Sequence, residues 1–499
     1  MSSNAKYNAD TRLSLRRRQF FEFFQHRTGA RWTTRAPDIP LAGQPPDVVL
    51  PTIEQTAFPY YRSGKGVSDL DAHADASTLA PKSRLAFDNL QTLKDYFAGE
   101  YPQIHYSKCL GFGGNGLAAA FNVFDKNGNR QPIVVKVIFQ DDEATLKKET
   151  DAHDEGLVKL GAKPKLDADG DEEMDEWRYT PIHTFMMEML ECGDLAQLIS
   201  RVKERGENFP GAMLWRLCLC FVRMCIALAY PPNNSIENQN REGPIRETVP
   251  RELRDEPGRW THFDFDPKNI FVGDINNDGE HDVTPTVKLG DFGLALEVQR
   301  GRGDFYYEKL RQRAKKYFMA PEQFCVDWDY IRRDEGFVGR HPIAGNFGSH
   351  TNVWAVMECL ITQCYPAWPP HPTATSRMPP TGKEWYYTYA GHLEQQVYSH
   401  VPREMIGLIS RLQAHLPEDR PKLFELEEYV TTMIRQQATG DERESRQLAD
   451  WFHEVLWEPR EAPPEPVGME NVWRDIVGTG LINQLPPNQV PRTFLLPFH

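Results

Sequence analysis

A glycine-rich run is the first stretch of this sequence whose residue types could do chemistry. Gly111, Gly113 and Gly116 follow the spacing G-x-G-x-x-G between two apolar runs of strand length, IHYSKCLG and LAAAFNVF. Glycines at this spacing let backbone amides approach phosphate oxygens without obstruction by side chains. In a dinucleotide-binding fold a helix would follow, but here a second strand and the hairpin signal DKNGN follow. The run therefore predicts a loop between two strands that covers a phosphate group.

A lysine in the next apolar run is the second candidate. Lys136 lies twenty residues after Gly116, inside IVVKVIF, which predicts a third strand. An unpaired ammonium is costly to bury, so this lysine needs a carboxylate partner unless it faces solvent from an edge strand. Residues 141–160 predict a helix, on which Glu149 shares a face with the leucines and Glu155 falls opposite. We therefore expect Glu149 to pair with Lys136.

Two later segments carry the strongest signal, THFDFDPKNIF at 261–271 and TVKLGDFGLA at 286–295. With the glycine run, Lys136 and a later A-P-E, they follow the motif order of the eukaryotic protein kinases, which the chain resembles over about 310 residues. One motif alone could arise by chance, but five in this order with fitting strand and helix contexts make a specific match. The matched positions are Asp264 for the aspartate of H-R-D, Asn269 five residues later, Asp291-Phe292-Gly293 for D-F-G and Ala320-Pro321-Glu322 for A-P-E.

The resemblance implies roles in phosphoryl transfer, which needs neutralised phosphate charge and an aligned hydroxyl. Lys136, held by Glu149, would contact the α- and β-phosphates of ATP. Asp264 would orient the substrate hydroxyl or receive its proton. Asn269 and Asp291 would hold magnesium, which prefers hard oxygen ligands. The other implied ATP contacts are Leu110, Gly111, Gly113, Gly116 and Ala118 around the glycine loop, backbone groups of Glu188 and Leu190 in the hinge, and Asp194 at the ribose.

The resemblance also implies positions that hold the fold. Asn352 stands where the family has the aspartate of D-V-W, at the start of a central helix. Arg420 stands where the family has the arginine that pairs with the A-P-E glutamate, which predicts a buried ion pair with Glu322. His262 begins the H-R-D motif, and Phe292 is the middle residue of D-F-G.

Two departures from the family pattern concern regulation. Phe263 replaces the arginine of H-R-D, and no Ser or Thr lies between Phe292 and Glu322. Both changes remove parts of a switch that responds to phosphorylation. We therefore expect activity without Ser/Thr phosphorylation of this segment.

A third departure changes the residues at two positions of the family pattern. The family usually has Lys two residues after the catalytic aspartate and Thr five residues before the alanine of A-P-E, but here these positions are Asp266 and Lys315. A carboxylate alone would repel the transferring phosphate. One interpretation is a charge exchange, in which Lys315 reaches Asp264 or Asp266 and supplies the missing cation, with Lys268 as a second candidate. The other interpretation is that Asp266 only caps its loop while Lys315 is solvated.

The elements that must position these residues imply an α+β fold. By resemblance it would be bilobal, with a small antiparallel-β lobe carrying one main helix and a larger, mainly α-helical lobe. The buried helix GAMLWRLCLCFVRMCIALAY would lie in the larger lobe. The expected division is a polar, largely disordered arm at 1–98, the small lobe and hinge at 99–190, the large lobe at 191–436 with a surface insertion at about 231–260, and a tail at 437–499 with one helix and a proline-rich end.

The composition of the 499-residue chain limits the kinds of partner that it can bind. Its formal charge of −14 argues against a general nucleic-acid-binding surface. The N-terminus lacks an apolar signal region, and no run approaches the roughly 18 apolar residues of a membrane span. The eight cysteines form no CxxC pair, which predicts neither a zinc site nor a disulfide framework. We therefore expect no nucleic acid or membrane as a partner and a cytosolic or nuclear location. The kinase resemblance adds a protein substrate, ATP and Mg²⁺, and the oligomeric state is open.

The leading interpretation is a protein kinase, of Ser/Thr type because that class is the more common. A pseudokinase or scaffold is a second possibility, although degenerate domains usually lose one of the four residues Lys136, Asp264, Asn269 and Asp291. A small-molecule phosphotransferase is a third, since that class also uses an H-x-D-x-x-x-x-N loop. The A-P-E segment and Arg420 favour a protein substrate over a small molecule.

Overall fold

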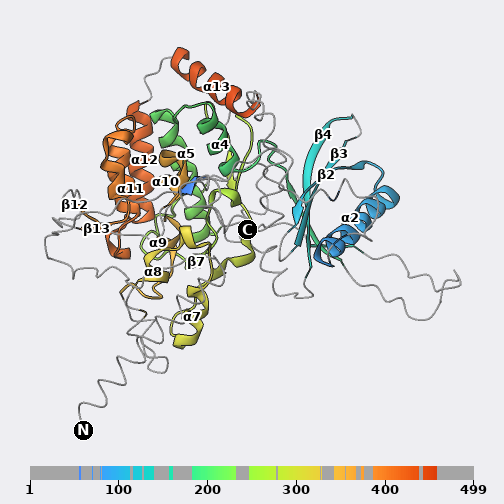
Figure 1. Ribbon diagram of the computed structural model, residues 1–499, viewed down its shortest axis with the longest axis horizontal. Helices are drawn as coiled ribbons and strands as arrows, with labels where there is room; N and C mark the ends of the chain where they lie inside the picture. The colour runs from blue at the N-terminus through green and yellow to red at the C-terminus, as the bar shows by residue number, and fades with distance from the viewer. Residues whose placement is uncertain are drawn as a thin grey trace, which may run out of the picture.

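The computed structural model describes most of the chain between Pro81 and Trp457. The described residues are 81–112, 116–125, 128–139, 157–160, 182–231, 247–276, 279–325, 342–354, 356–366, 373–375, 386–437 and 442–457, with Thr56–Ala57, Leu70, Leu79 and Trp328. They form a mixed α+β structure, which confirms the expected class. Figure 1 shows the sheet strands β2, β3 and β4 with α2 on one side of the molecule and most of the helices on the other.

An antiparallel sheet carries the N-terminal part of the described chain. Its strand order is β2-β3-β4-β6-β5. The three runs predicted as strands around the glycine loop, and the later run HTFMMEML, are confirmed as strands. The bounds are β2 (Ile104–Phe112), β3 (Gly116–Phe124), β4 (Arg130–Ile138), β5 (Leu157–Leu160) and β6 (Ile182–Glu188).

The expected helix over 141–160 is wrong at its end. Leu157–Leu160 forms β5, which pairs antiparallel with β6. A short apolar run such as LVKL fits a buried helix or a buried strand equally well by periodicity, so only its partner strand decides between them. The helical face used to select Glu149 included Leu157 and Leu160, and that part of the reasoning no longer holds. Glu149 itself lies outside the described residues.

Helix α2 (Pro81–Glu100) covers one face of this sheet (Figure 1). Its buried residues Ala86, Leu90, Leu93 and Phe97 recur at intervals of three and four, so they form one apolar face. The Phe97 ring packs on Phe121 of β3 at 4.8 Å between centroids. The boundary expected for the arm at residue 98 is therefore wrong, because helix α2 already begins at Pro81.

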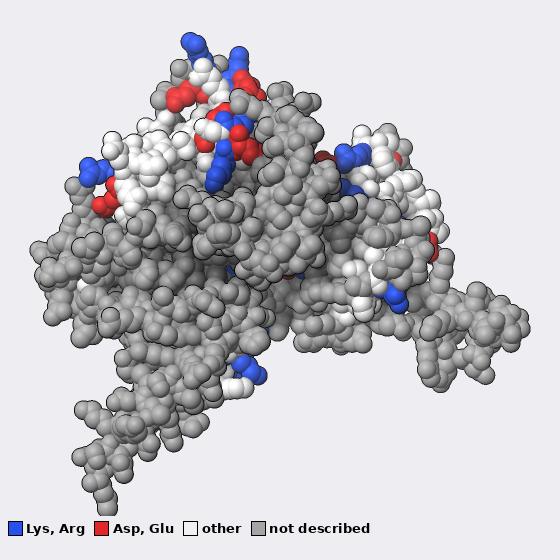
Figure 2. Space-filling model, in the orientation of Figure 1, with Lys and Arg blue, Asp and Glu red and all other residues white. Residues whose placement is uncertain are grey.

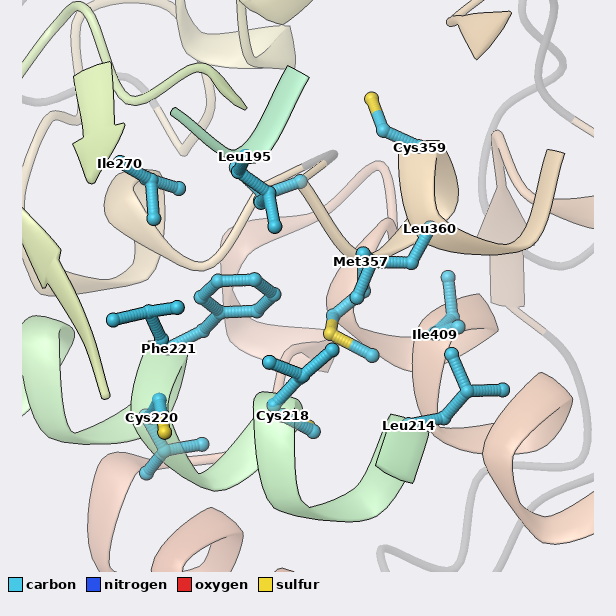
Figure 3. Packing of buried hydrophobic residues seen from close by; sticks show 14 of the residues in the cluster. Leu195, Leu214, Cys218, Cys220, Phe221, Ile270, Met357, Cys359, Leu360 and Ile409 are labelled. Carbon is cyan, nitrogen blue, oxygen red and sulfur yellow. The ribbon is translucent and has the colours of Figure 1, made fainter. Parts of the chain in front are cut away.

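Most of the remaining helices gather around α5, the buried helix predicted from its continuous apolar run. Leu214, Cys218 and Phe221 of α5 share one core cluster with Met357 of α10 and Ile409 of α11 (Figure 3). The helices are α4 (Leu195–Glu204), α5 (Gly211–Ala229), α7 (Asp304–Arg311), α8 (Pro321–Phe324), α9 (Ser349–Asn352), α10 (Val356–Thr362), α11 (Arg403–Leu412), α12 (Leu423–Gln437) and α13 (Glu442–Trp457).

Helix α5 corrects one expectation. Among the described residues it is long and apolar enough to cross a membrane by length and composition, contrary to the view that no run approaches that length. However, 78% of its most apolar window is buried inside the structure. Its apolar residues are therefore accounted for by the protein core.

Short strand pairs position the segments between the helices. β7 precedes the H-F-D segment and β8 follows it, while β9 and β10 flank D-F-G. The pairs are β7 (Trp260–Thr261) with β10 (Leu296–Glu297), β8 (Ile270–Val272) with β9 (Val287–Leu289), β1 (Thr56–Ala57) with β11 (Cys364–Tyr365), and β12 (Thr373–Thr375) with β13 (Tyr386–Thr388). These pairings bring the H-F-D and D-F-G segments together although more than twenty residues separate them in sequence.

Candidate active site

The loop between β7 and β8 holds Asp264 against Asn269. Asn269 Nδ2 donates to the backbone oxygen of Asp264 at 2.8 Å and to its Oδ2 at 2.8 Å. The short 3₁₀ turn Pro267–Asn269 returns the chain so that the two side chains meet. With both amide hydrogens used, Asn269 Oδ1 is the oxygen that can accept a ligand.

His262 holds the same loop through both of its ring nitrogens. Its Nδ1 accepts the backbone N–H of Asp264 at 3.3 Å, and its Nε2 lies 3.1 Å from the carbonyl oxygen of Gly290. This network assigns the proton to Nε2, which donates to Gly290. Burial lowers the pKa of His262 to about 4, so the ring is neutral at pH 7. His262 therefore links the Asp264 loop to the strand that ends before Asp291.

Asn352, predicted from the D-V-W position, anchors the start of this loop. Its Oδ1 accepts the N–H of His262 at 3.0 Å, and its Nδ2 donates to the carbonyl oxygen of Trp260 at 2.8 Å. An amide can both accept and donate, so Asn352 bonds two backbone groups on either side of Thr261. The asparagine thus ties α9 to the H-F-D segment.

Two non-glycine residues of the site have left-handed backbone conformations. Phe263 has φ 60° and Asp291 has φ 56°. Such conformations cost roughly 1–3 kcal/mol and persist only where surrounding contacts impose them. Phe292, next to Asp291, packs edge-to-face on His262 with 5.0 Å between ring centroids. The loop contacts therefore hold Asp291 in one strained orientation.

Lys136 and Asp291 join the sheet to the helical part. Ala118 and Lys136 pair in register, and their neighbours Leu117 and Val137 pack toward α2, so Lys136 points to the opposite face of the sheet. There its Nζ donates to Asp291 Oδ1 at 2.9 Å. Burial would raise the pKa of Asp291, but the Lys136 ammonium holds it below its ordinary value. Asp291 is therefore a carboxylate at neutral pH.

One oxygen of Asp264 is left without a partner. Asp264 Oδ1 is buried and has no hydrogen-bond partner among the described residues. Leaving such an acceptor unsatisfied costs about 1–3 kcal/mol, so a hydroxyl or cation at this point would be favourable. Within the described residues no group of three or more His, Cys, Asp or Glu side chains could hold a metal alone. Asn269 Oδ1 and Asp291 still fit magnesium, which usually takes few protein ligands and completes its shell with phosphates and water.

The described part of the glycine loop is built for close backbone approach. A Cβ at Gly116 would lie 2.1 Å from the carbonyl oxygen of Val137, so no side chain fits there. Gly111 has φ 149°, and a β-bulge separates Cys109 from it, which places Leu110 in the bulge. Ala118 pairs with Gly111. Gly113 lies outside the described residues.

The expected hinge residues follow the edge of β6. Met189 donates its N–H to the carbonyl oxygen of Pro132 at 3.3 Å, so the backbone groups of Glu188 point away from β4 by the alternation of an antiparallel ladder. That direction suits the adenine contact predicted for Glu188 and, two residues on, for Leu190. The Glu188 side chain pairs with Lys288.

Asp194, expected at the ribose, caps helix α4. Its Oδ1 accepts the N–H of Gln197 at 2.8 Å, and its Oδ2 accepts from Gln197 Nε2 at 3.3 Å. Burial raises the pKa of Asp194 to about 6. A ribose hydroxyl would have to share or replace the second of these bonds, so this role stays a prediction.

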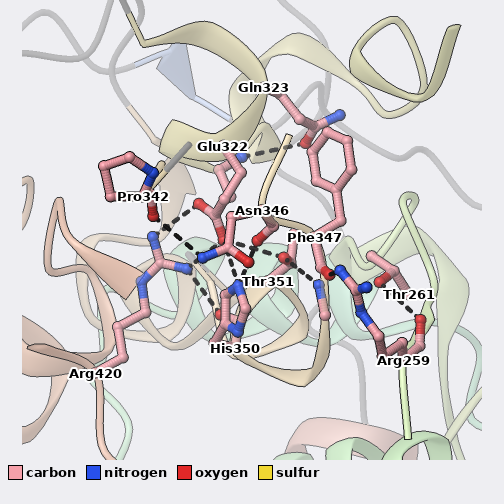
Figure 4. A network of polar contacts seen from close by, with 12 residues as sticks. Arg259, Thr261, Glu322, Gln323, Pro342, Asn346, Phe347, His350, Thr351 and Arg420 are labelled. Atoms are coloured by element: carbon pink, nitrogen blue, oxygen red, sulfur yellow. Dashed lines mark hydrogen bonds and ion pairs between the residues drawn. The ribbon is translucent and has the colours of Figure 1, made fainter. Parts of the chain in front are cut away.

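The predicted pair of Glu322 and Arg420 is confirmed, and its surroundings are larger than expected. Arg420 Nη1 and Nη2 lie 2.8 and 2.9 Å from the two oxygens of Glu322, with both side chains fully buried. Thr351 Oγ1 donates to Glu322 Oε1 at 3.0 Å, and the carbonyl oxygen of His350 accepts from Arg420 at 2.8 Å (Figure 4). His350 and Thr351 were not predicted from the sequence, although they directly precede Asn352.

Asp266 and Lys315, the two residues of the third departure from the family pattern, are in contact. Lys315 Nζ contacts Asp266 Oδ2 and lies 3.5 Å from Asp264 Oδ2. Asp266 and Lys268 are linked through the backbone N–H of Lys268, which donates to Asp266 Oδ1 at 2.7 Å. The structure thus brings three residues of one loop, Asp264, Asp266 and Asn269, together with Lys136, Asp291 and Lys315 from distant parts of the sequence.

No family model matches this chain, and no curated protein matches it either.

Proposed function

We propose that this chain is a protein kinase, with the bilobal fold of that superfamily, that transfers the γ-phosphate of ATP to a Ser or Thr hydroxyl of a protein. The observation that carries the proposal is the unpartnered, buried Asp264 Oδ1, held beside Asn269 and close to the Lys136–Asp291 pair. An acceptor at this point is suited to a hydroxyl that must be aligned and deprotonated. The nearby ammonium is suited to phosphate oxygens.

The chemistry assigns one task to each group. Asp264 Oδ1 accepts the hydrogen of the attacking hydroxyl and orients its oxygen toward the γ-phosphorus. Lys136 binds phosphate oxygens of ATP, and the open edge of β6 at Glu188 and Leu190 receives the adenine. Asn269 Oδ1 and Asp291 would hold magnesium, which neutralises phosphate charge when bound.

The segment between D-F-G and A-P-E is held by apolar contacts. Phe263, at the position of the missing arginine, is buried in a cluster with Val298, Tyr307, Leu310 and Phe347. Its ring lies 5.2 Å from that of Phe347, edge to face. Tyr307 further donates from its hydroxyl to the carbonyl oxygen of Gln299 at 2.9 Å. These contacts support a kinase whose segment needs no phosphate to be ordered.

The deciding experiment measures transfer of radiolabelled γ-phosphate from ATP with magnesium, to the chain itself and to generic proteins. Wild type is compared with Asp264→Asn and Asp291→Asn, and each variant is checked for folding by circular dichroism and for ATP binding by calorimetry. Transfer that Asp264→Asn abolishes while ATP binding remains supports the proposal. ATP binding by a wild type that transfers nothing would instead favour a scaffold, and transfer only to small hydroxyl compounds would favour a small-molecule phosphotransferase.

A further inference from the structure

Two carboxylates and one ammonium meet beside the unpaired oxygen of Asp264. Lys315 Nζ contacts Asp266 Oδ2 and lies 3.5 Å from Asp264 Oδ2. The Asp266 side chain is 1% exposed, whereas that of Lys315 is 45% exposed. The carboxylate is therefore a fixed internal anchor, and the ammonium reaches it from the open side of the site.

The two oxygens of Asp266 have separate partners. Oδ1 accepts the N–H of Lys268 at 2.7 Å and caps the 3₁₀ turn that leads to Asn269. Oδ2 is left for Lys315. The loop-capping role and the ion-pair role are thus both present, and neither excludes the other.

The segment that delivers Lys315 is fixed at Arg313, two residues before that lysine. Arg313 Nη1 donates to the carbonyl oxygen of Leu294 at 2.8 Å, and Gln323 Nε2 donates to the carbonyl oxygen of Arg313 at 2.5 Å. Ala314, the next residue, has φ 89°, a strained conformation for an alanine. Such strain persists only where the surroundings impose it. Here it turns the chain so that Lys315 faces the Asp264 loop.

The local charges need this ammonium. Asp264 and Asp266 lie within reach of one lysine, and a phosphoryl group arriving at the hydroxyl held by Asp264 would bring further negative charge close to them. Opposite charge within a few ångströms, in a partly buried site, is the main means by which proteins stabilise such a group. Lys315 is the cation that the structure holds against both carboxylates.

We propose that Lys315 supplies the cation that stabilises the transferring phosphoryl group, and that Asp266 is the residue that positions it. This inference rests on the proposed kinase function. The hydroxyl oxygen of the acceptor forms a bond to the γ-phosphorus, and the bond from that phosphorus to the β–γ bridging oxygen breaks. ADP leaves with the electron pair, the hydroxyl proton passes to Asp264, and Lys315 remains protonated throughout.

The proposed catalytic cation and the aspartate beside it come from different segments of the chain. Lys315 comes from the segment after α7, while Asp264 comes from the loop after β7. Displacement of the segment would therefore remove the cation from Asp264 and Asp266. Activity then depends on the apolar contacts of Phe263 with this segment, because those contacts hold the segment in place without a phosphate group.

The kinetic test compares Lys315→Met, Lys315→Arg and the control Lys309→Met. Lys309 is an exposed lysine on α7 whose ammonium lies 4.6 Å from the centre of the Phe305 ring. Loss of one charge-stabilising donor predicts that Lys315→Met lowers kcat about 10²–10³-fold, with KM for ATP unchanged. Lys315→Arg should retain more activity than Lys315→Met, and Lys309→Met should equal wild type. A Lys315→Met variant as active as wild type, in a protein that Asp264→Asn inactivates, overturns the inference and leaves the kinase function intact.

A charge exchange tests the positioning role of Asp266. Asp266→Lys and Lys315→Asp each place like charges together and should be nearly inactive. The double variant restores one cation and one carboxylate at this place, and should exceed both single variants in kcat. If the double variant does not fold, Asp266→Asn takes its place, with a predicted loss of kcat at unchanged KM for ATP. Full activity of Asp266→Asn would contradict a positioning role.

A second readout needs no transfer. Trace acetylation with acetic anhydride, followed by mass spectrometry, compares the amine reactivity of Lys315 and Lys309 in one sample. The ion pair with Asp266 predicts that Lys315 reacts more slowly than Lys309 and that Asp266→Asn removes most of the difference. Equal rates in wild type would overturn the inference even if the protein is an active kinase. If wild type transfers nothing, the proposed function fails, and this inference fails with it whatever the labelling shows.

Discussion

At the scale of single residues, the most deeply buried charges lie at Glu322 and Arg420, away from Asp264. Both side chains are fully buried, and their two hydrogen bonds of 2.8 and 2.9 Å form a planar fork. Burial would raise the pKa of Glu322, but Arg420 holds it below its ordinary value. Removing one partner leaves the other charge unpaired in the core, which is far more costly than removing both.

Arg420→Met should therefore lower the free energy of unfolding by about 3–5 kcal/mol. The double variant Arg420→Met with Glu322→Gln should lose less than the single variant, because it leaves no buried charge. Urea unfolding followed by circular dichroism measures both. Lys422→Met, which removes an exposed ion pair with Asp255, is the control and should unfold as wild type does. A double variant less stable than Arg420→Met would contradict this account.

His415 adds a dependence on pH. Burial, with Arg420 adding to it, lowers the pKa of His415 to about 4, and the neutral ring accepts the hydroxyl of Tyr389 at Nδ1, 2.9 Å away. Below pH 6.5 the unfolded chain binds a proton at this residue that the folded chain excludes. The stabilisation is thus complete above pH 6.5 and is lost as the pH falls toward 4.

The comparison of wild type with His415→Gln isolates this residue from the other histidines and carboxylates that titrate in the same window. Between pH 7 and pH 5, wild type should lose about 2 kcal/mol more of its unfolding free energy than His415→Gln does. The measurement is urea unfolding at both pH values. Equal losses in the two proteins would show that His415 is not kept neutral by folding.

The candidate site could be predicted where partners are close in sequence or where a motif pairs them. Asp264 and Asn269 are five residues apart, and their contact follows from one short turn. The contact of Lys315 with Asp266 could only be posed as one of two alternatives, because it depends on the path of a segment 49 residues away. His350 and Thr351 were missed, since nothing in the sequence says which side chains line a buried ion pair.

At the scale of elements, α13 shows how the tail of the chain completes the core. Phe452 is fully buried, and its neighbours Val455 and Leu456 join the same cluster. Arg201 of α4 donates to the carbonyl oxygen of Leu456 at 3.0 Å, and Trp451 donates from Nε1 to Glu207 at 2.6 Å. Figure 2 shows acidic and basic side chains interleaved over the outer face of this helix. The apolar face therefore docks on α4, and the outer face is solvated.

Phe452→Ala should release α13 from α4 at a cost of about 3–5 kcal/mol, the usual range for such a truncation in a core. Hydrogen exchange with mass spectrometry should show faster exchange in peptides from 442–457 and little change in α5. His453→Ala, on the exposed face of the same helix, is the control. Unchanged protection of α13 in Phe452→Ala would mean that the helix is held by its polar contacts instead.

The elements also show which sequence signals can be trusted. The strands around the glycine loop and helix α5 were predicted correctly because their apolar runs are long and clearly bounded. Helix α2 was missed although Ala86, Leu90, Leu93 and Phe97 mark its apolar face, because its overall composition is polar. Leu157–Leu160 was misassigned because four residues cannot show a period, and its identity as a strand depends on β6.

At the scale of the whole molecule, the contact of Lys136 with Asp291 joins the sheet to the helical part, where the proposed function requires the nucleotide. The lysine side chain is 16% exposed and the aspartate 49% exposed, so the pair is open to a ligand on one side. A ligand that contacts both parts stabilises the folded chain by mass action. Binding should therefore appear as a rise in the melting temperature of the whole chain.

ATP with magnesium at about 100 times its Kd should add about 2.7 kcal/mol to the free energy of unfolding. Lys136→Met should remove most of this gain, because the phosphates lose their ammonium on the sheet side. Lys94→Met is the control: Lys94 lies on α2 with its ammonium 4.0 Å from the centre of the Tyr106 ring, on the face of the sheet opposite Lys136. Thermal unfolding with and without MgATP measures all three proteins. A nucleotide-dependent gain that survives Lys136→Met unchanged would place the nucleotide site away from this lysine.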